Sequence, residues 1–378
     1  MKLAIVCYPT FGGSGVVATM LGTALAERGH EVHFVTYKQP VRLELLSRNI
    51  FFHEVNVEEY PLFHYQPYDL ALSSKLVNVV KEYNIELLHV HYAIPHAYAG
   101  YMAQQMLKDH GITLPMVTTL HGTDITLVGN HPVYKPSVTF SINHSDVVTS
   151  VSASLKRDTL ELFDITKHID VVPNFIDMSQ YKTEFKDCDR TIMAFPQERI
   201  ITHISNMRPV KRIMDVVKVF EKIEKEIPSI LIMVGDGPER FAAEEYANEA
   251  GLKLKIKWVG NSTEIDRILC FSDLFLLPSE KESFGLAALE AMANRTPVIS
   301  TDTGGLPEVN EDGVSGYTCA VGDLKGMATK AIEILKDDQV LDRFKNSAFA
   351  KAEQYDIFKI IPQYEKLYET VLASTNGN

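Results

Sequence analysis

The sequence predicts two α/β domains in series, each with a doubly wound, Rossmann-like parallel sheet. Short apolar runs alternate along the chain with longer segments of helical periodicity, which is typical of right-handed βαβ units. The alternation stops at a polar stretch near the middle and then restarts, so two sheets are expected. Ligands bind such sheets at the carboxyl ends of the strands, so two domains facing across a cleft would hold a substrate there.

The first domain is expected to cover residues 1–172. Its predicted strands are the apolar runs at 3–7, 32–36, 50–57, 87–91, 116–120 and 147–151. Its predicted helices are the periodic segments at 16–28, 70–82, 97–108 and 137–143. Aromatic residues and prolines are mixed in the segment 58–69, which favours a loop.

A polar linker is expected at residues 173–199, followed by a second domain at 200–357. The predicted strands of this domain are the apolar runs at 200–204, 230–234, 256–259, 274–277 and 297–300. Between the first two of them, apolar residues at 213, 216, 217, 220 and 223 share one face of a helix. Further helices are expected from residue 325 onward.

Charge and composition exclude several classes of partner. The formal net charge of -12 argues against nucleic acid, so any phosphate must be bound by local groups. The hydrophobic fraction of 46% and the charged fraction of 23% are ordinary for a globular protein. The N-terminal apolar run is too short for a signal peptide or a membrane span, so we expect a cytoplasmic protein without stable membrane insertion.

The cysteines and the acidic pairs do not predict a metal or a disulfide framework. The four cysteines lie far apart without a C-x-x-C spacing, and three of them have apolar neighbours typical of small core residues. A D-x-D match at 187–189 lies in the linker without a preceding strand, so we treat it as chance. We therefore predict no metal site and no cofactor.

A strand followed by a helix in the second half of the chain has the composition of a ligand site. The apolar run 274–277 stops at Pro278, as a buried parallel strand would. After a charged turn, residues 285–294 are nearly all Ala, Leu and Met, which predicts a helix with little polar surface. The opening of this helix would lie at the carboxyl edge of the sheet, where ligands bind.

Two glutamates and three donors surround this helix opening. Eight positions separate Glu282 from Glu290, so both carboxylates face one side if the turn runs into the helix. Ser283 and the backbone N–H groups of Phe284 and Gly285 would open the helix, where unpaired donors attract phosphate. Together these groups suit a sugar nucleotide. The alternative is a capping Glu282 and a solvated Glu290.

A glycine-rich loop follows the first strand. Gly13 and Ser14 begin a G-x-G-x-x-A match, a dinucleotide fingerprint when an acid also ends the second strand. That strand ends instead in V-T-Y-K, so a nicotinamide site is not predicted. We interpret the loop as a backbone nest for a phosphate or for the acceptor; a plain strand-to-helix turn is the alternative.

Two further loops carry candidate groups at strand ends. His121 ends a strand and is followed by Gly-Thr-Asp, a loop able to approach a ligand; a histidine that only caps the sheet is the alternative. After the first strand of the second domain, Arg208 and Lys211 could bind a diphosphate, although two solvated surface cations would also fit. His89 and His91 share one face of a strand and suggest no metal-ligand spacing.

The stretch S-E-K-E-S-F-G-L-A-A-L-E-A-M-A resembles the signature of retaining GT-B glycosyltransferases of the sucrose-synthase-like family. This resemblance implies the GT-B fold, with Glu282 at the donor sugar, Glu290 at the nucleotide ribose and His121 beside the sugar. It implies Lys211 at the diphosphate, where Asn206 replaces the arginine usual in the family. It also implies that residues 358–378 pack back onto the first domain, and that the T-G-G-L-P-E segment at 303–308 lies beside the donor.

A narrower resemblance is to the members of this family that join N-acetylglucosamine to L-malate in the first step of bacillithiol biosynthesis. The stretches C-Y-P, G-G-S-G-V-V, H-V-H-Y-A-I-P-H and T-T-L-H-G-T-D carry it. It implies UDP-N-acetylglucosamine as donor, L-malate as acceptor, retention of configuration and no metal. In these members an asparagine is usual at the position of Asn206, which therefore joins the donor contacts. The leaving phosphate would take the acceptor proton in a same-face displacement.

A dicarboxylate acceptor needs one or two cations and hydroxyls in the first domain. Arg42 could hold a carboxylate in a fork, with hydroxyls from Tyr92, Thr118 and Thr119 nearby; Arg42 as an idle surface residue is the alternative. Rival hypotheses are another acceptor such as an inositol phosphate or a polysaccharide, a UDP-N-acetylglucosamine 2-epimerase, and a binding module without catalysis. A homo-oligomer is left open.

Overall fold

The computed structural model describes residues 1–10, 12–58, 65–181 and 188–376, and the chain divides into two compact units. Unit 1 comprises Met1–Phe175 and Ile357–Asn378, and unit 2 comprises Ile176–Asp356. The boundaries expected for the domains, 1–172, 173–199 and 200–357, stay a prediction. Part of the expected linker (182–187), the first residue of the D-x-D match, and residues 59–64 of the expected loop at 58–69 lie outside the described residues.

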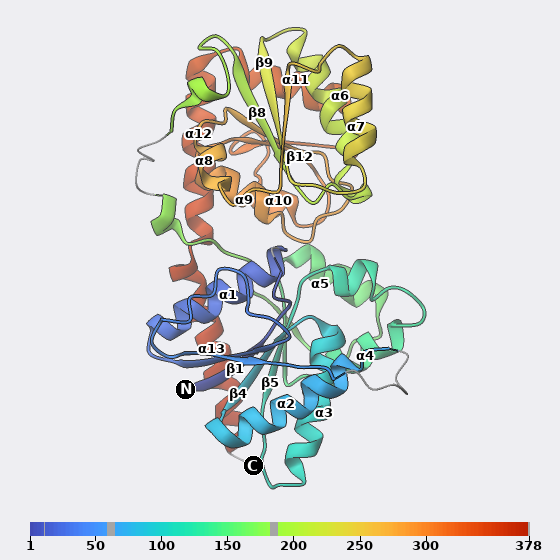
Figure 1. Cartoon of the computed structure of the whole chain (residues 1–378), viewed down its shortest axis with the longest axis vertical. Coiled ribbons are helices and arrows are strands. Elements are labelled where there is room, and N and C mark those ends of the chain that lie inside the picture. Colours follow the sequence, from blue (N-terminus) through green and yellow to red (C-terminus); the bar gives the residue numbers. More distant parts are fainter. Residues whose placement is uncertain (11, 59–64, 182–187, 377–378) are drawn as a thin grey trace. The chain divides into compact units, whose positions relative to one another are not determined.

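Unit 1 is an α/β unit with a parallel sheet (Figure 1). Its strands are β1 (Lys2–Val6), β2 (Glu31–Thr36), β3 (Ile50–Glu54), β4 (Leu87–His91), β5 (Met116–Leu120), β6 (Val147–Ser150) and β7 (Ile169–Val171). Its helices are α1 (Gly13–Glu27), α2 (Tyr68–Tyr83), α3 (Tyr98–Lys108), α4 (Lys135–Asn143), α5 (Ala153–Leu162) and α13 (Ile357–Asn376). We did not predict β7, which has only three residues, or α5, whose apolar residues are few.

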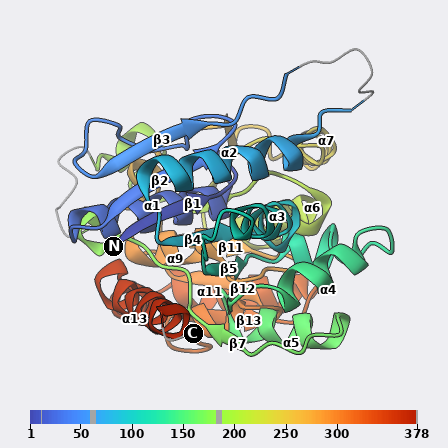
Figure 2. The same cartoon turned by 90° about the horizontal axis from the view of Figure 1, so that it is seen from below.

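The sheet of unit 1 has the order β3-β2-β1-β4-β5-β6-β7 among the described residues, with β3 and β7 at its edges (Figure 2). Alternation along β4 divides its side chains between two covered faces. Leu88 and Val90 join the apolar core with α2 and α3, whereas His89 faces α13, where Tyr368 contacts it. Helix α13 is further joined to α1 by the ion pair of Arg28 with Glu365, at 2.7 Å.

Unit 2 repeats this architecture. Its strands are β8 (Arg199–Ile204), β9 (Ser229–Val234), β10 (Ile256–Gly260), β11 (Leu274–Leu277), β12 (Val298–Thr301) and β13 (Gly316–Cys319). Its helices are α6 (Ile213–Glu224), α7 (Arg240–Glu249), α8 (Ile265–Cys270), α9 (Leu286–Ala293), α10 (Leu306–Val309), α11 (Leu324–Leu335) and α12 (Asp338–Ala352). All pairs of neighbouring strands are parallel, in the order β10-β9-β8-β11-β12-β13.

Both sheets reverse direction of winding beside their first strand. In unit 1, β1 lies between β2 and β4, and in unit 2, β8 lies between β9 and β11. Such a switch point leaves a crevice at the carboxyl ends of the two central strands, because their connections leave in opposite directions. The loops after β1 and β4, and those after β8 and β11, are therefore where each unit is expected to bind ligands.

One disulfide was not expected from the sequence. Cys188 and Cys270 are bonded within unit 2, with their Cα atoms 6.0 Å apart and a sequence separation of 82. Their spacing carried no signal, because the fold alone brings the start of unit 2 to the end of α8. Cys7 is fully buried, as expected for a core residue. In the ranges that the structure describes, no helix is long and apolar enough to cross a membrane.

Candidate active site

In unit 2, the loops that follow β8 and β11 are joined side by side. The backbone N–H of Glu280 donates to the carbonyl of Val210 at 2.8 Å, which ties the two loops together. This contact follows from the sheet order, since β8 and β11 are neighbours. It brings the predicted residues Lys211 and Glu282 to one place.

Lys211 and Glu282 form an ion pair at this place. The Lys211 ammonium donates to Oε1 of Glu282, and the hydroxyl of Ser279 donates to the same oxygen at 2.9 Å. The two charged side chains are only 20% and 13% exposed, so their attraction is little screened by water. Ser279, which is fully buried, was not among the predicted site residues; a hydroxyl three residues before the acid was the available signal.

The loop after β12 fixes the backbone of Glu282. The N–H of Gly305 donates to the Glu282 carbonyl at 2.9 Å. Gly304 has φ +60°, and a Cβ there would lie 1.9 Å from the same carbonyl oxygen, so only glycine fits this close approach. The Gly-Gly pair expected beside the donor therefore positions the turn that carries Glu282.

Helix α9 begins later than the spacing argument assumed. The predicted helix covered 285–294, whereas α9 runs from Leu286 to Ala293 with Gly285 at φ +99° before it. Glu282 thus precedes a left-handed residue, and it does not share a helical face with the half-buried Glu290. Both carboxylates were expected on one side only if the turn ran into the helix, and this condition is not met.

The groups at the start of α9 differ in exposure. Phe284 is buried and its ring meets that of Tyr355 edge-on, with centroids 5.5 Å apart. Ser283 is half-buried and Gly285 is buried. The first N–H groups of α9 have no carbonyl one turn earlier in the helix, so this end can accept an anion.

Asn206 and Arg208 lie on the exposed part of the loop after β8. Met207 between them is fully buried and has φ +42°, so its two neighbours point outward. Among the described residues, the guanidinium of Arg208 has no ion pair or hydrogen bond. Of the two predicted cations, the structure brings Lys211 to Glu282 and leaves Arg208 at the surface.

In unit 1, two histidines meet where β4 and β5 end. Nδ1 of His91 lies 2.8 Å from Nε2 of His121. Burial lowers the pKa of His121 to about 3 and that of His91 well below its usual range. Both rings are therefore neutral at pH 7, and each carries one proton.

Asp124 links the two strand ends. Its carboxylate accepts hydrogen bonds from the backbone N–H groups of Ala93 and Gly122, both at 2.9 Å, and of His121 at 3.2 Å. Burial raises the pKa of this carboxyl, while the three donors oppose that rise. We had assigned no role to Asp124; an acid three residues after a strand-end histidine was the signal.

The glycine-rich loop and the end of β4 also meet. Helix α1 begins at Gly13, and Oγ of Ser14 lies 3.0 Å from the hydroxyl of Tyr92. Tyr92 has φ +86°, and the ring of Tyr8 contacts its ring edge-on at 5.1 Å. Gly13, Ser14 and Tyr92 therefore lie around the switch point of unit 1.

Thr118 and Thr119 do not reach this place, which corrects our expectation that they line an acceptor pocket. Both are fully buried on β5. The Thr118 hydroxyl pairs with Ser145 at 2.7 Å, and that of Thr119 pairs with His89 at 2.8 Å. Successive side chains of a central strand point to its two covered faces, so neither hydroxyl is offered to a ligand.

Arg42 lies in an exposed segment between β2 and β3. It has φ +64°, and in the described part of the chain its guanidinium forms no ion pair. The charge of the Arg42 guanidinium is thus available to a ligand. No other predicted acceptor residue contacts it in the described part of the chain.

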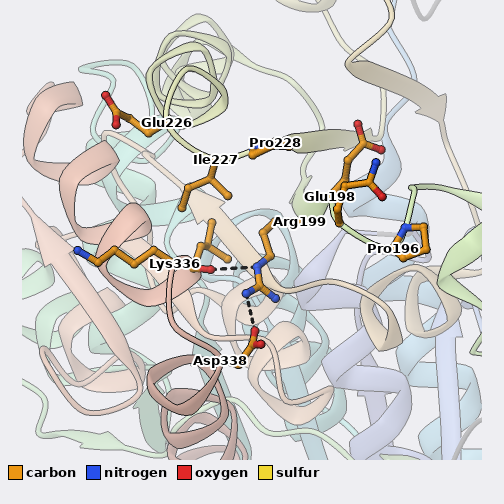
Figure 3. Close-up of a pocket in the computed structure, with 10 residues that line it drawn as sticks. Pro196, Glu198, Arg199, Glu226, Ile227, Pro228, Lys336 and Asp338 are labelled. Carbon is orange, nitrogen blue, oxygen red and sulfur yellow. Dashed lines mark hydrogen bonds and ion pairs between the residues drawn. The ribbon is translucent and has the colours of Figure 1, made fainter.

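A separate pocket of unit 2, about 450 Å³ in volume, lies away from Lys211 and Glu282 (Figure 3). It is at the amino ends of β8 and β9, opposite to the edge where Lys211 and Glu282 meet. Arg199 crosses it and donates to the Leu335 carbonyl at 2.9 Å and to Asp338 at 2.5 Å. None of the predicted site residues lines this pocket. Among the described residues, no three His, Cys, Asp or Glu side chains are grouped to hold a metal ion.

Known families match both halves of the chain. Residues 11–180 match the model described as Glycosyltransferase Family 4, and residues 186–351 match that of Glycosyl transferases group 1. The chain is 46% identical over 377 residues to the N-acetyl-alpha-D-glucosaminyl L-malate synthase of Bacillus anthracis, covering 98% of this chain and 97% of that one. It is 26% identical to the 2-deoxystreptamine N-acetyl-D-glucosaminyltransferase of Niallia circulans, over 78% and 79% of the two chains.

Solved structures share the fold. Anabaena Alr3699/HepE in complex with UDP and glucose superimposes with a TM-score of 0.84 at 18% identity, over 98% of this chain and 100% of that one. The sucrose-phosphate synthase of Thermosynechococcus elongatus superimposes with a TM-score of 0.80 at 20% identity, over 99% of both. The α/β architecture of GT-B type expected from the sequence is therefore confirmed.

Proposed function

The chain belongs to the glycosyltransferases of group 1 and family 4, and from this membership we propose that it moves N-acetylglucosamine from UDP-N-acetylglucosamine to the hydroxyl of L-malate. The observation that carries the proposal is the 46% identity, over 98% of this chain, to a relative named for that product. The bond from the sugar C1 to the phosphate oxygen breaks, and a bond from C1 to the malate hydroxyl oxygen forms. The new bond is proposed on the same face, with the leaving phosphate taking the hydroxyl proton.

Donor binding is proposed for unit 2. Lys211 stabilises the charge that develops on the departing diphosphate, together with the first N–H groups of α9. Glu282 orients the sugar hydroxyls and Glu290 the ribose. The ion pair of Lys211 with Glu282 supports this assignment. It keeps a cation, which can bind a phosphate, next to a carboxylate, which can accept hydrogen bonds from sugar hydroxyls.

The remaining donor contacts are proposed from the exposed part of the loop after β8. Asn206 and Arg208 are free to reach a nucleotide there. Gly13 and Ser14 of unit 1 are proposed to meet a phosphate or the acceptor, and His121 to lie beside the sugar. No residue in this scheme needs a metal ion.

Acceptor binding is proposed for Arg42 and Tyr92 in unit 1. Arg42 would bind a carboxylate of the acceptor with two parallel hydrogen bonds, and the Tyr92 hydroxyl is proposed as a further polar contact. Thr118 and Thr119 are left out, since their hydroxyls are engaged inside the sheet. The cytoplasmic location stays a prediction, and a homo-oligomer stays open.

The test is release of UDP from UDP-N-acetylglucosamine with and without acceptors. We expect UDP to appear with L-malate far faster than with D-malate, with inositol phosphate or without an acceptor. Faster release with inositol phosphate would overturn the acceptor and leave a glycosyltransferase. Conversion of the sugar nucleotide without any acceptor would favour an epimerase instead.

A further inference from the structure

A ladder of buried polar side chains connects β4 to β5 on the face covered by α13. His89 pairs in register with Val117, yet Nε2 of its ring contacts Oγ1 of Thr119, two residues further along β5, at 2.8 Å. His91 pairs with Thr119 and contacts His121, again two residues further, at 2.8 Å. The rings of His89 and His91 stack with centroids 4.5 Å apart. The second step of this ladder ends on a residue of the proposed site.

The position of one proton decides what His121 can offer to a ligand. A neutral imidazole has one donor and one acceptor nitrogen, so either His91 donates to His121 or His121 donates to His91. In the first case Nε2 of His91 is a bare acceptor, and in the second it is an N–H. This atom is buried and has no partner among the described residues.

The first arrangement is the favoured one. A buried N–H without a partner is costlier and rarer than a buried acceptor without one. His96, whose ring is equally buried, follows the same pattern. Its Nδ1 lies 2.6 Å from the carbonyl oxygen of His91, so this nitrogen must be the N–H, and its Nε2 is left as an unpartnered acceptor.

His121 then carries its proton on Nδ1. That atom makes no hydrogen bond to a described residue, and it is not among the buried polar atoms without a partner, so it reaches the surface of unit 1. The residue is 9% exposed. The following residue, Gly122, has φ +113°, and its N–H donates to Asp124, which fixes the backbone that carries the His121 ring.

We propose that His91 is a positioning residue: its Nδ1–H holds Nε2 of His121, and His121 thereby presents an Nδ1–H donor to an oxygen of the sugar substrate. The second half of this statement rests on the proposed function. Histidines that bind metals are oriented in the same way, by a partner on the second ring nitrogen.

The proton position is tested first, without substrate. In protein labelled with ¹⁵N at histidine, long-range ¹H–¹⁵N spectra distinguish Nδ1–H from Nε2–H rings, and the signals of His121 are identified by their loss in His121→Gln. We expect the Nδ1–H form for His121 in the native chain, and a shift toward Nε2–H in His91→Leu. An Nε2–H ring in the native chain would overturn the proposal, whether or not the protein transfers a sugar.

Transfer to L-malate is measured next. Groups that orient a metal ligand through a hydrogen bond account for about 10- to 100-fold in activity, and we expect a loss of this size in kcat for His91→Leu. His91→Asn should restore most of it, because the asparagine amide nitrogen lies near the place of Nδ1. UDP affinity should not change in either variant, since UDP lacks the N-acetylglucosamine that His121 is proposed to contact.

His89→Leu is the matched control. It removes an equally buried histidine of the same strand. His89 is hydrogen-bonded to Tyr368 and Thr119 and not to His121. We expect it to lower thermal stability about as much as His91→Leu does and to retain more activity. Equal losses of kcat in the two leucine variants, without recovery in His91→Asn, would show that His91 is only structural. A native chain that releases no UDP would refute the proposed function. The spectra would then still test whether His91 fixes the proton position of His121.

Discussion

The ammonium of Lys211 and the carboxylate of Glu282 are ion-paired across 71 residues of sequence. The pair joins the loop after β8 to the loop after β11, the two strands that flank the switch point of unit 2. In the proposed reaction, each partner also has a separate role, the cation at the diphosphate and the carboxylate at the sugar.

Lys211→Ala is expected to lower kcat by about 10²-fold or more, because removal of a preorganised charge from a developing anion costs that much. UDP release with L-malate is the measurement. Lys225→Ala, which removes an exposed lysine of the same unit, should have no effect. Asn206→Ala should cost much less than Lys211→Ala, and equal losses would show that the phosphate site is wrongly assigned.

Glu290→Ala is expected to weaken UDP binding more than it changes stability. A hydrogen bond to a charged group contributes about 1.5–3 kcal/mol, so the Kd should rise about tenfold or more. Calorimetric titration with UDP measures this, and Glu245→Ala on exposed α7 is the helix control. Unchanged affinity together with a large drop in Tm would make Glu290 a structural residue.

Arg42→Ala is expected to raise the KM for L-malate while the UDP affinity stays the same. The reason is the loss of a guanidinium that could bind one carboxylate with two parallel hydrogen bonds. Initial rates at varied malate give the KM. Arg48→Ala is the control, since Arg48 is also exposed in the same segment. If both variants behave like the native protein, Arg42 has no part in acceptor binding.

Removal of divalent ions is expected to leave transfer intact, because the proposed leaving-group contacts are Lys211 and N–H groups. Rates before and after dialysis against excess EDTA are compared. Activity that disappears and returns with Mn²⁺ or Mg²⁺ would contradict the metal-free mechanism.

The thermal stability of the protein is expected to fall on acidification below about pH 6. Burial lowers the pKa of His89 and His121 to about 3, and that of His96 and His203 to about 4, from an ordinary value of 6.5. Between these values the unfolded chain binds protons that the folded chain does not. Stability is therefore complete above pH 6.5 and is lost as the pH falls toward 4.

Each such histidine steepens this dependence by up to about 1.4 kcal/mol per pH unit. Calorimetric scans between pH 8 and pH 5 measure it, with a constant Tm expected from 8 to 7. A Tm that stays constant down to pH 5 would show that these rings accept protons in the folded state.

The sequence alone determined the fold class and the family. Strands buried on both faces are apolar throughout, and their alternation with helical periodicity is a local property of the chain. The same holds for the glutamates and Gly285, because the signature keeps them close along the sequence, and for Lys211, because it lies in the loop directly after an apolar strand. Lys211, Glu282 and Glu290 are therefore identified as candidate site residues by the sequence alone.

Only the tertiary structure decided which of the named residues meet. The order of strands in each sheet is not a local property. It brought Lys211 into contact with Glu282, and Ser14 into contact with Tyr92. The left-handed Gly285 separated Glu282 from the helix of Glu290, although the spacing had suggested one face. Thr118 and Thr119 were enclosed because strand β5 is covered on both sides.

The histidine ladder shows most clearly that contacts between strands cannot be predicted from local sequence. The alternation of His89 and His91 indicated one shared face, but the sequence did not say which strand that face would meet. The register of β4 against β5 brought His91 to His121, and the burial of its second nitrogen determined the direction of the hydrogen bond between them. Both depend on residues some 30 positions apart, which only the folded sheet brings into contact.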